Sequence, residues 1–264
     1  MSTEYGAVDD SSPLRGGSGA HQNEAQQQRR WASQIVRSCL VEFVGTLLFV
    51  FIGCLLALGA GDSLVPVALG HGLAIAFLVI SMGHISGGHF NPAVTFGVFC
   101  SGCQPLLDAV LYIVCQLAGS LLGAMLVELV VSAADYTTIA GGVTTFGHDG
   151  WFRATVTELV LTFGLVNTVL NAAVDSDGAT PTGALAIGLT VVASIFAGAK
   201  VSGASLNPAR SFGPAVIYSL LGDVSKVQWS YHFVYWLGPL AGGAIAAVFY
   251  KLVFARQGRR LLMK

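Results

Sequence analysis

Charged side chains are scarce in this chain. Its 264 residues include 13 Lys and Arg and 14 Asp and Glu, which together make up 10% of the sequence. Soluble globular domains contain about 25% charged residues, and a chain with so few cannot cover its surface for water. The scarcity therefore excludes an ordinary soluble domain. The net charge of −1 also leaves no basic face for a nucleic-acid partner.

The placement of the cysteines predicts neither a disulfide framework nor a metal site. The five cysteines are Cys39, Cys54, Cys100, Cys103 and Cys115. None of them lies in the longest predicted outer loop, residues 132–151, where disulfides would be expected. Cys100 and Cys103 form one C-x-x-C pair, but the second pair that a zinc site typically needs is missing.

Apolar residues are abundant, at 54% of the sequence with a mean hydropathy of +0.70. They gather in six long segments and two short ones. The long segments are residues 38–60, 65–83, 105–131, 152–173, 182–200 and 230–254. Each is near the ~20 residues that a helix needs to cross a membrane. The sequence therefore predicts an all-α membrane protein with six transmembrane helices.

A short motif occurs twice in matching surroundings. Asn91-Pro92-Ala93 returns as Asn207-Pro208-Ala209, 116 residues later. Other pairs with the same separation are Glu42 and Glu158, Thr46 and Thr162, Gly72 and Gly188, and Ser86 and Ser202. One ancestral half has been duplicated, and such repeats in membrane proteins place a transport site at the repeat interface.

The two short apolar segments, residues 91–100 and 207–220, each begin at an Asn-Pro-Ala. Asn is a good helix cap, and Pro is tolerated in the first helical turn because it needs no amide partner there. About ten helical residues reach ~15 Å, half of the membrane. We expect two re-entrant half-helices, dipping from opposite faces. Because each half has three full spans, the second half must insert upside down, giving an inverted three-helix repeat.

Basic residues predict the orientation and the domain limits. Nine of the 13 Lys and Arg lie in the terminal regions, which places both termini in the cytoplasm. Residues 1–34 are predicted to be a disordered cytoplasmic tail, since they contain little apolar sequence. They lack the apolar core of a cleaved signal peptide. Residues 35–255 are the membrane domain, with half-repeats at 36–131 and 152–254, and residues 256–264 form a basic cytoplasmic tail.

The residues around the two motifs resemble a known family. Residues 86–95 read SGGHFNPAVT and residues 202–214 read SGASLNPARSFGP. Both closely resemble the signature loops of the aquaporins, the major intrinsic protein family, and the resemblance covers residues 36–255. It implies a homotetramer in membrane lipid, with one pore per subunit. It also implies passage of water and small neutral solutes without a cofactor and without enzymatic activity.

The residues themselves suggest how such a pore would select. Two half-helix N-termini that meet at mid-membrane place two positive dipole ends beside the lumen. Asn91 and Asn207 would add side-chain donors there, so that passing water turns its oxygen to both and cannot conduct protons. Arg210 lies nearly one turn beyond Asn207. A guanidinium is too costly to face lipid, so we expect it to line the outer mouth and to exclude cations.

Position-matching to the family gives a four-residue filter of His71, Ile195, Ala204 and Arg210. Strict water channels of the family carry Phe and His at the first two positions. Here Ile195 removes a polar wall and His71 trims an aromatic ring, which predicts a wider constriction. The set resembles the aquaporin-eight-like branch and some plant tonoplast channels, which implies passage of ammonia and hydrogen peroxide beside water. Glycerol is disfavoured, because Ser211 stands where glycerol channels carry Asp.

Four further residues are candidates for supporting roles. The shared offset and the resemblance imply that Glu42 and Glu158 hydrogen-bond the re-entrant loops; the alternative is a proton relay. By resemblance, His89 lines the inner vestibule. Cys54 matches a cysteine of the aquaporin-eight-like branch, and it is either an oxidation-sensitive gate or a buried packing thiol.

Two other classes of function fit a duplicated membrane domain. A proton-coupled secondary transporter also uses inverted repeats, and it would need Glu42 or Glu158 to change protonation during transport. A low-flux structural membrane protein would form tetramers with negligible permeability. Saturable, proton-driven uptake would favour the first of these, and negligible flux through folded tetramers the second.

Overall fold

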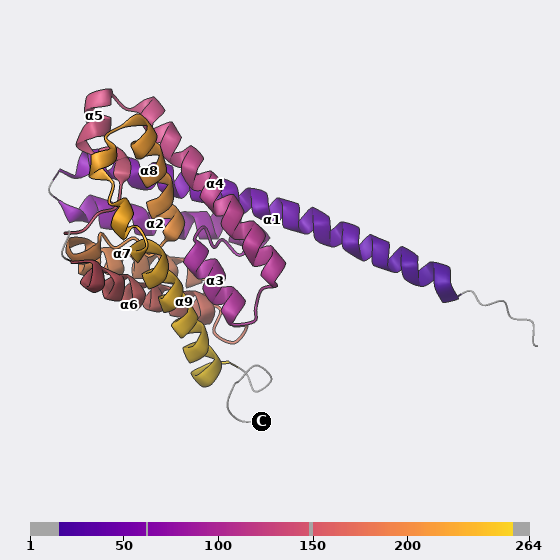
Figure 1. Cartoon of the computed structure of the whole chain (residues 1–264). Coiled ribbons are helices and arrows are strands. Elements are labelled where there is room, and N and C mark those ends of the chain that lie inside the picture. The colour runs from indigo at the N-terminus through magenta and orange to yellow at the C-terminus, as the bar shows by residue number, and fades with distance from the viewer. Residues whose placement is uncertain (1–15, 62, 148–149, 256–264) are drawn as a thin grey trace, which may run out of the picture. The chain divides into compact units, whose positions relative to one another are not determined.

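The computed structural model describes residues 16–61, 63–147 and 150–255. Its α-helices are α1 (Gly16–Ala60), α2 (Leu64–Ser86), α3 (Pro92–Cys100), α4 (Leu106–Val130), α5 (Ala133–Thr138), α6 (Trp151–Val169), α7 (Gly183–Ser202), α8 (Pro208–Leu221) and α9 (Val234–Val253) (Figure 1). Shorter turns are η1 (Ala140–Gly142), the π-helical η3 (Leu170–Val174), η4 (Val224–Lys226) and η5 (Trp229–Tyr231). Six helices are long and apolar enough to span a membrane: α1, α2, α4, α6 with η3, α7 and α9. The predicted all-α membrane fold is confirmed.

The structure differs from the predicted N-terminal tail. Residues 16–34 are helical, as the first part of α1, whereas a disordered segment was expected up to residue 34. The physical reason is composition: residues 24–30 are Glu, Ala, Gln and Arg, which favour helix although they are not apolar. Residues 1–15 and the basic tail 256–264 lie outside the described residues. The chain divides into two units after Val36, and the description below concerns the second.

Helices α2 and α7 cross at the centre of the repeat. A Cβ on Gly72 would lie 2.5 Å from the carbonyl oxygen of Gly188, and a Cβ on Gly188 would lie 2.4 Å from that of Gly72. These two glycines are repeat-equivalent, so each half presents the same surface to the other. Only glycine permits backbones to approach this closely, as is common where helices pack in lipid.

The outer helices of each half pack in the same manner. In the first half, Gly119 of α4 lies against α1, and a Cβ on Gly119 would lie 2.2 Å from the Phe43 carbonyl oxygen. In the second half, Gly242 of α9 lies against α6, and a Cβ on Gly242 would lie 2.3 Å from the Leu159 carbonyl oxygen. Phe43 and Leu159 are 116 residues apart. The duplicated sequence therefore gives two copies of one helix arrangement.

The half-helices α3 and α8 pack across the repeat boundary. A Cβ on Gly213 of α8 would lie 2.5 Å from the Ser120 carbonyl of α4, and one on Gly243 of α9 would lie 2.7 Å from the Ala93 carbonyl of α3. Helix α3 has 9 residues and α8 has 14. At 1.5 Å per residue they reach about 14 and 21 Å, less than the ~30 Å hydrocarbon core. Each half-helix is thus held by a full-length helix from the other half.

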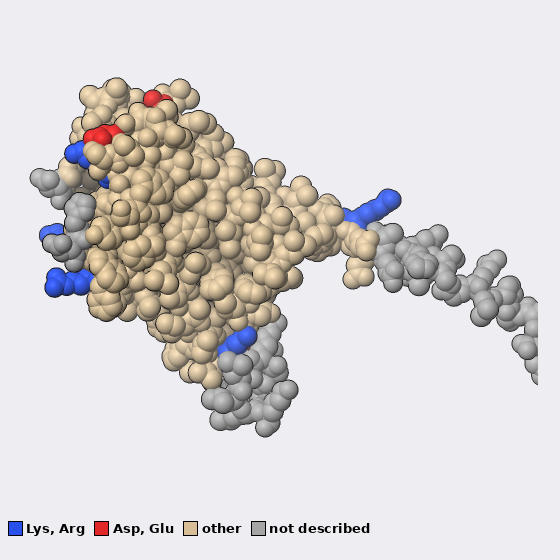
Figure 2. Space-filling model, in the orientation of Figure 1, with Lys and Arg blue, Asp and Glu red and all other residues tan. Residues whose placement is uncertain are grey.

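Charged side chains on the outer surface lie near its edges. On the face that Figure 2 shows, Lys, Arg, Asp and Glu lie only near the edges, and the surface between them is uncharged. The exposed side chains along the spanning helices include Leu73, Phe77, Ile80 and Leu129. Large apolar side chains that are exposed in this manner require lipid or another apolar partner. The surface is consistent with an integral multi-pass membrane protein.

Candidate pore at the meeting of the half-helices

Two buried carboxylates hold the loops that lead into the half-helices. Glu158 Oε1 accepts hydrogen bonds from the Ser202 hydroxyl and the Ser205 amide, both at 2.8 Å, and its Oε2 accepts from the Leu206 amide at 2.7 Å. Glu42 has the same contacts in the first half, with Ser86 Oγ at 2.7 Å, the His89 amide at 2.9 Å and the Phe90 amide at 2.7 Å. Both carboxylates are fully buried.

The carboxylates stabilise a backbone that few residues adopt freely. Phe90 and its repeat equivalent Leu206 have φ of 48° and 56°, and Gly88 and Ala204 have φ of 66° and 47°. Non-glycine residues at positive φ are strained and persist only where surrounding contacts fix them. The amides that the two glutamates bind belong to these turns. The strained turns aim the chain so that each Asn-Pro-Ala begins a helix at the centre of the molecule.

The two asparagines cap their own helices and join the two halves. Asn91 Oδ1 accepts from the Ala93 amide at 2.8 Å, and Asn207 Oδ1 accepts from the Ala209 amide at 3.0 Å. Asn91 Nδ2 donates to the Leu206 carbonyl at 2.8 Å, and Asn207 Nδ2 donates to the Phe90 carbonyl at 2.9 Å. Each amide nitrogen carries two hydrogens, so one N–H on each remains for a ligand.

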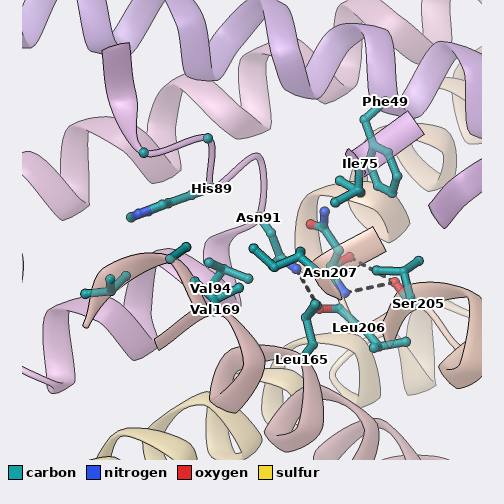
Figure 3. A pocket seen from close by; sticks show the side chains of 16 residues that line it. Phe49, Ile75, His89, Asn91, Val94, Leu165, Val169, Ser205, Leu206 and Asn207 are labelled. Atoms are coloured by element: carbon teal, nitrogen blue, oxygen red, sulfur yellow. Dashed lines mark hydrogen bonds between the residues drawn. The ribbon is translucent and has the colours of Figure 1, made fainter. Parts of the chain in front are cut away.

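Both asparagines line a cavity of about 90 Å³ (Figure 3). A single water needs only ~10–15 Å³ of such space, so several waters fit. Polar lining comes from the asparagines, His89 and Ser205, and apolar lining includes Phe49, Ile75 and Val191. The lining therefore combines a few hydrogen-bonding groups with apolar walls, which is typical of sites for small molecules.

The four predicted filter residues lie in the interior. His71, Ile195 and Ala204 are buried, each with 5% exposure or less, and Arg210 is half-buried on α8. Arg210 Nη1 donates to the Gly142 carbonyl at 2.9 Å and to the Thr144 hydroxyl. His71 Nδ1 contacts the Val67 carbonyl at 2.8 Å, and its Nε2 has no partner among the described residues.

Cys54 packs against Gly142, the residue whose carbonyl accepts a hydrogen bond from Arg210. The thiol is 1% exposed, and a Cβ on Gly142 would lie 2.4 Å from its sulfur. Gly142 has φ of 80° and bonds the guanidinium through its carbonyl. The sequence could not show this connection, because η1 and the loop after it lie between two spans and have no motif of their own.

Several polar residues of the site were missed by the sequence reasoning. Thr144 contacts Arg210 and Ser211, and Gln116 contacts both Glu42 and Thr95. Gln116 could have been noticed as a polar residue within an apolar span. Thr95 and Ser211 share the repeat offset of 116, which was a usable signal. Thr144 has no comparable pattern.

Comparison with known proteins gives the family. The sequence profile of the family described as Major intrinsic protein matches residues 29–250. The chain is 36% identical to aquaporin-8 of Mus musculus over 238 residues, which cover 89% of this chain and 88% of the mouse protein. It is 42% identical to aquaporin TIP1-2 of Zea mays over 240 residues, 84% of this chain and 87% of the maize protein.

A solved structure has the same fold. The aquaglyceroporin from Plasmodium falciparum matches with a TM-score of 0.73 at 24% identity, covering 84% of this chain and 97% of that one. The chain described here belongs to the major intrinsic protein family. It is therefore a membrane channel for water or small solutes and not an enzyme, as the sequence predicted.

Proposed function

We propose that the protein is a passive channel for water, ammonia and hydrogen peroxide that excludes protons and ions. The observation that carries this proposal is the pair of asparagines whose Nδ2 atoms bridge the two half-helices beside one cavity. Each has one remaining N–H for a permeant molecule. Neutral solutes with a lone pair can accept those bonds in passing, and no covalent or conformational step is needed.

Proton exclusion follows from the same geometry. The N-termini of α3 and α8 both start at the cavity, so that two positive dipole ends, each about half a charge, act on its contents. A water that accepts from both asparagines has its hydrogens pointing away from the centre on both sides. A continuous chain of hydrogen bonds in one direction is then broken, and hydronium is repelled by the dipoles.

Stopped-flow measurements on proteoliposomes test the proposal. We expect water permeability well above that of protein-free liposomes, a low activation energy, and no proton current under a pH gradient. Swelling no faster than in empty liposomes, with folded protein, would contradict the channel and favour a structural membrane protein. Saturable uptake that depends on the proton gradient would instead indicate a secondary transporter.

Ammonia and peroxide are proposed as permeants because of the filter. Ile195 contributes hydrocarbon where strict water channels of the family carry a polar side chain, and His71 is smaller than Phe. A less polar wall reduces the advantage of water over ammonia, since water loses more hydrogen bonds on entering it. The similarity to aquaporin-8 of mouse and to aquaporin TIP1-2 of maize agrees with the resemblance to these two branches on which the proposed substrate range rests.

The double variant Ile195→His with His71→Phe tests this filter. We expect a narrower and more polar constriction, so that the ratio of ammonia to water permeability falls by about fivefold to tenfold, the effect of one hydrogen bond. The ratio is measured by stopped flow in matched proteoliposomes, with Leu189→Val, an exposed position on the same helix, as the control. An unchanged or raised ratio means that selectivity is set elsewhere.

Cys54 is proposed to act as a redox gate on the filter. Peroxide would oxidise the thiol to a sulfenic acid and leave as water. The added oxygen has no space, because the sulfur is buried against Gly142. Displacing Gly142 moves the carbonyl that holds Arg210.

Peroxide treatment tests the gate. We expect it to lower water permeability at least about twofold, with recovery after reduction by dithiothreitol, while Cys54→Ser stays open because it lacks the oxidisable sulfur. Cys103→Ser is the matched control and should close like the wild type. Equal inhibition of wild type and Cys54→Ser would show that another group is responsible.

A homotetramer with cytoplasmic termini completes the proposal. Apolar side chains are exposed along the spanning helices of one subunit, among them Leu73, Phe77 and Ile80 of α2, and subunit contacts would cover part of them. The concentration of basic residues near both ends of the sequence supports the cytoplasmic orientation.

A further inference from the structure

A pair of polar side chains spans each Asn-Pro-Ala motif. In the first half, His89 Nδ1 lies 3.1 Å from Thr95 Oγ1. In the second half, Ser205 Oγ lies 2.6 Å from Ser211 Oγ. Position 205 is 116 residues after 89, and 211 is 116 after 95. The duplication has therefore kept a contact between the loop and the half-helix while the side chains changed.

Each pair contacts a third side chain, and this third member differs between the halves. In the first half it is Gln116 of α4, whose Nε2 donates to Thr95 Oγ1 and to Glu42 Oε2, both at 2.8 Å. In the second half it is Thr144, whose hydroxyl lies 3.3 Å from Ser211 Oγ and also accepts a hydrogen bond from Arg210. Through Thr144, Arg210 is thus connected to the pair of Ser205 and Ser211, whereas His89 is itself a member of the other pair.

Hydrogen-bond accounting fixes which atom donates at His89. Both hydrogens of Gln116 Nε2 are used, one on Glu42 and one on Thr95. Thr95 is fully buried, so its own hydroxyl hydrogen must find an acceptor. Among the described partners of this hydroxyl, only His89 Nδ1 can accept. His89 Nδ1 therefore carries no hydrogen, and in the neutral ring the hydrogen is on Nε2.

The Nε2 edge of His89 lies beside Gly87, a residue that lines the same cavity. His89 and Gly87 both line it, and a Cβ on Gly87 would lie 3.2 Å from Nε2. Nε2 has no hydrogen-bond partner in the part of the chain that the structure describes. The ring is held in place by Tyr112, which packs edge-on at 5.5 Å between centroids and donates from its hydroxyl to the Ser86 carbonyl at 2.9 Å.

We propose that Gln116 and Thr95 are positioning residues that lock His89 in the Nε2-protonated form, so that the inner vestibule presents a donor to the permeant. This inference rests on the proposed channel function and extends its donor set inward from Asn91 and Asn207. The opposite tautomer would present a bare Nε2 to the lumen, and a bare imidazole nitrogen accepts protons. The lock therefore removes a proton-accepting group from the inner end of the path.

Nitrogen-15 NMR of histidine-labelled protein in proteoliposomes tests the lock directly. The sequence has six histidines, and a His89→Gln variant assigns the signals by difference. At pH 8, where an ordinary histidine with pKa ~6.5 is neutral, we expect wild-type His89 to be protonated on Nε2 only. A wild-type His89 protonated on Nδ1 overturns the proposal without the need for any further variant.

Variants of the two positioning residues give the second arm. Thr95→Val should change the tautomer ratio by about fivefold or more towards Nδ1–H, the factor expected for one lost hydrogen bond. Gln116→Leu should change the ratio in the same direction, because the Thr95 hydroxyl oxygen can then accept a hydrogen bond from His89 Nδ1–H. Thr95→Ser keeps the hydroxyl and should give the wild-type ratio. Ser211→Ala is the matched control from the other repeat and should leave the His89 signals unchanged.

The functional readout is the ratio of proton to water flux. It should rise in Thr95→Val and return to the wild-type value in Thr95→Ser. An unaltered tautomer ratio in both Thr95→Val and Gln116→Leu overturns the proposal. The NMR result does not depend on flux. If the protein conducted no water, the channel function would be refuted, while the tautomer of His89 would still be decided by the NMR signals.

Discussion

Glu158→Leu is expected to remove most of the folded protein. The substitution deletes the acceptor of the Ser205 and Leu206 amides and of the Ser202 hydroxyl. All three donors are buried, and each buried donor left without a partner costs about 1–3 kcal/mol. The sum is about 3–9 kcal/mol, against a total stability of ~5–15 kcal/mol for a typical protein. The yield of monodisperse protein in detergent and its midpoint of thermal unfolding measure the effect.

Glu158→Gln separates hydrogen bonding from simple bulk. Glutamine keeps one acceptor oxygen and nearly the same volume, but its amide group meets the backbone N–H groups donor to donor. We expect an intermediate loss of stability, and the same order of effects at Glu42 because the contacts are repeat-equivalent. Glu128→Gln, near the end of α4, is the control and should be neutral. A stable, fully folded Glu158→Leu protein would show that the strained loops do not depend on the carboxylate.

Arg210→Val is expected to make the channel leak cations. A unit charge acts on a cation 8 Å away with about 2 kcal/mol at an effective dielectric constant of 20. Removing the guanidinium should therefore raise cation conductance by roughly thirtyfold, because each 1.4 kcal/mol is a factor of ten. The protein should still fold, since Val is apolar and the partners of the guanidinium are a carbonyl and a hydroxyl. Conductance across planar bilayers provides the measurement.

Arg153→Val is the matched control for the loss of a positive charge. Arg153 is exposed near the start of α6, away from the contacts that hold Arg210, and its removal should leave the ion barrier intact. Arg210→Lys tests geometry further, because lysine keeps the charge but not the planar, fixed geometry in which Nη1 donates to both Gly142 and Thr144. An Arg210→Val channel as ion-tight as the wild type would show that the outer barrier lies elsewhere.

The sequence determined the elements of this protein and their symmetry. Six spans follow from apolar segments near ~20 residues, and two half-helices follow from Asn-Pro starts on segments too short to cross. The offset of 116 residues alone pairs Glu42 with Glu158 and Gly72 with Gly188. These inferences succeed because helix length, helix caps and internal repetition are local properties, written in consecutive residues.

Only the tertiary structure decided which polar side chains meet in the interior. Gln116 reaches Thr95 and Glu42, 21 and 74 residues away in sequence, and Thr144 reaches Arg210, 66 residues away. The crossing of α4 over the first half-helix and the path of the loop through η1 bring these atoms within hydrogen-bonding distance. Neither depends on a local pattern, because the position of a side chain across a helix crossing is set by the packing of glycine faces. The same packing, and not the motif itself, places Cys54 behind the carbonyl that holds Arg210.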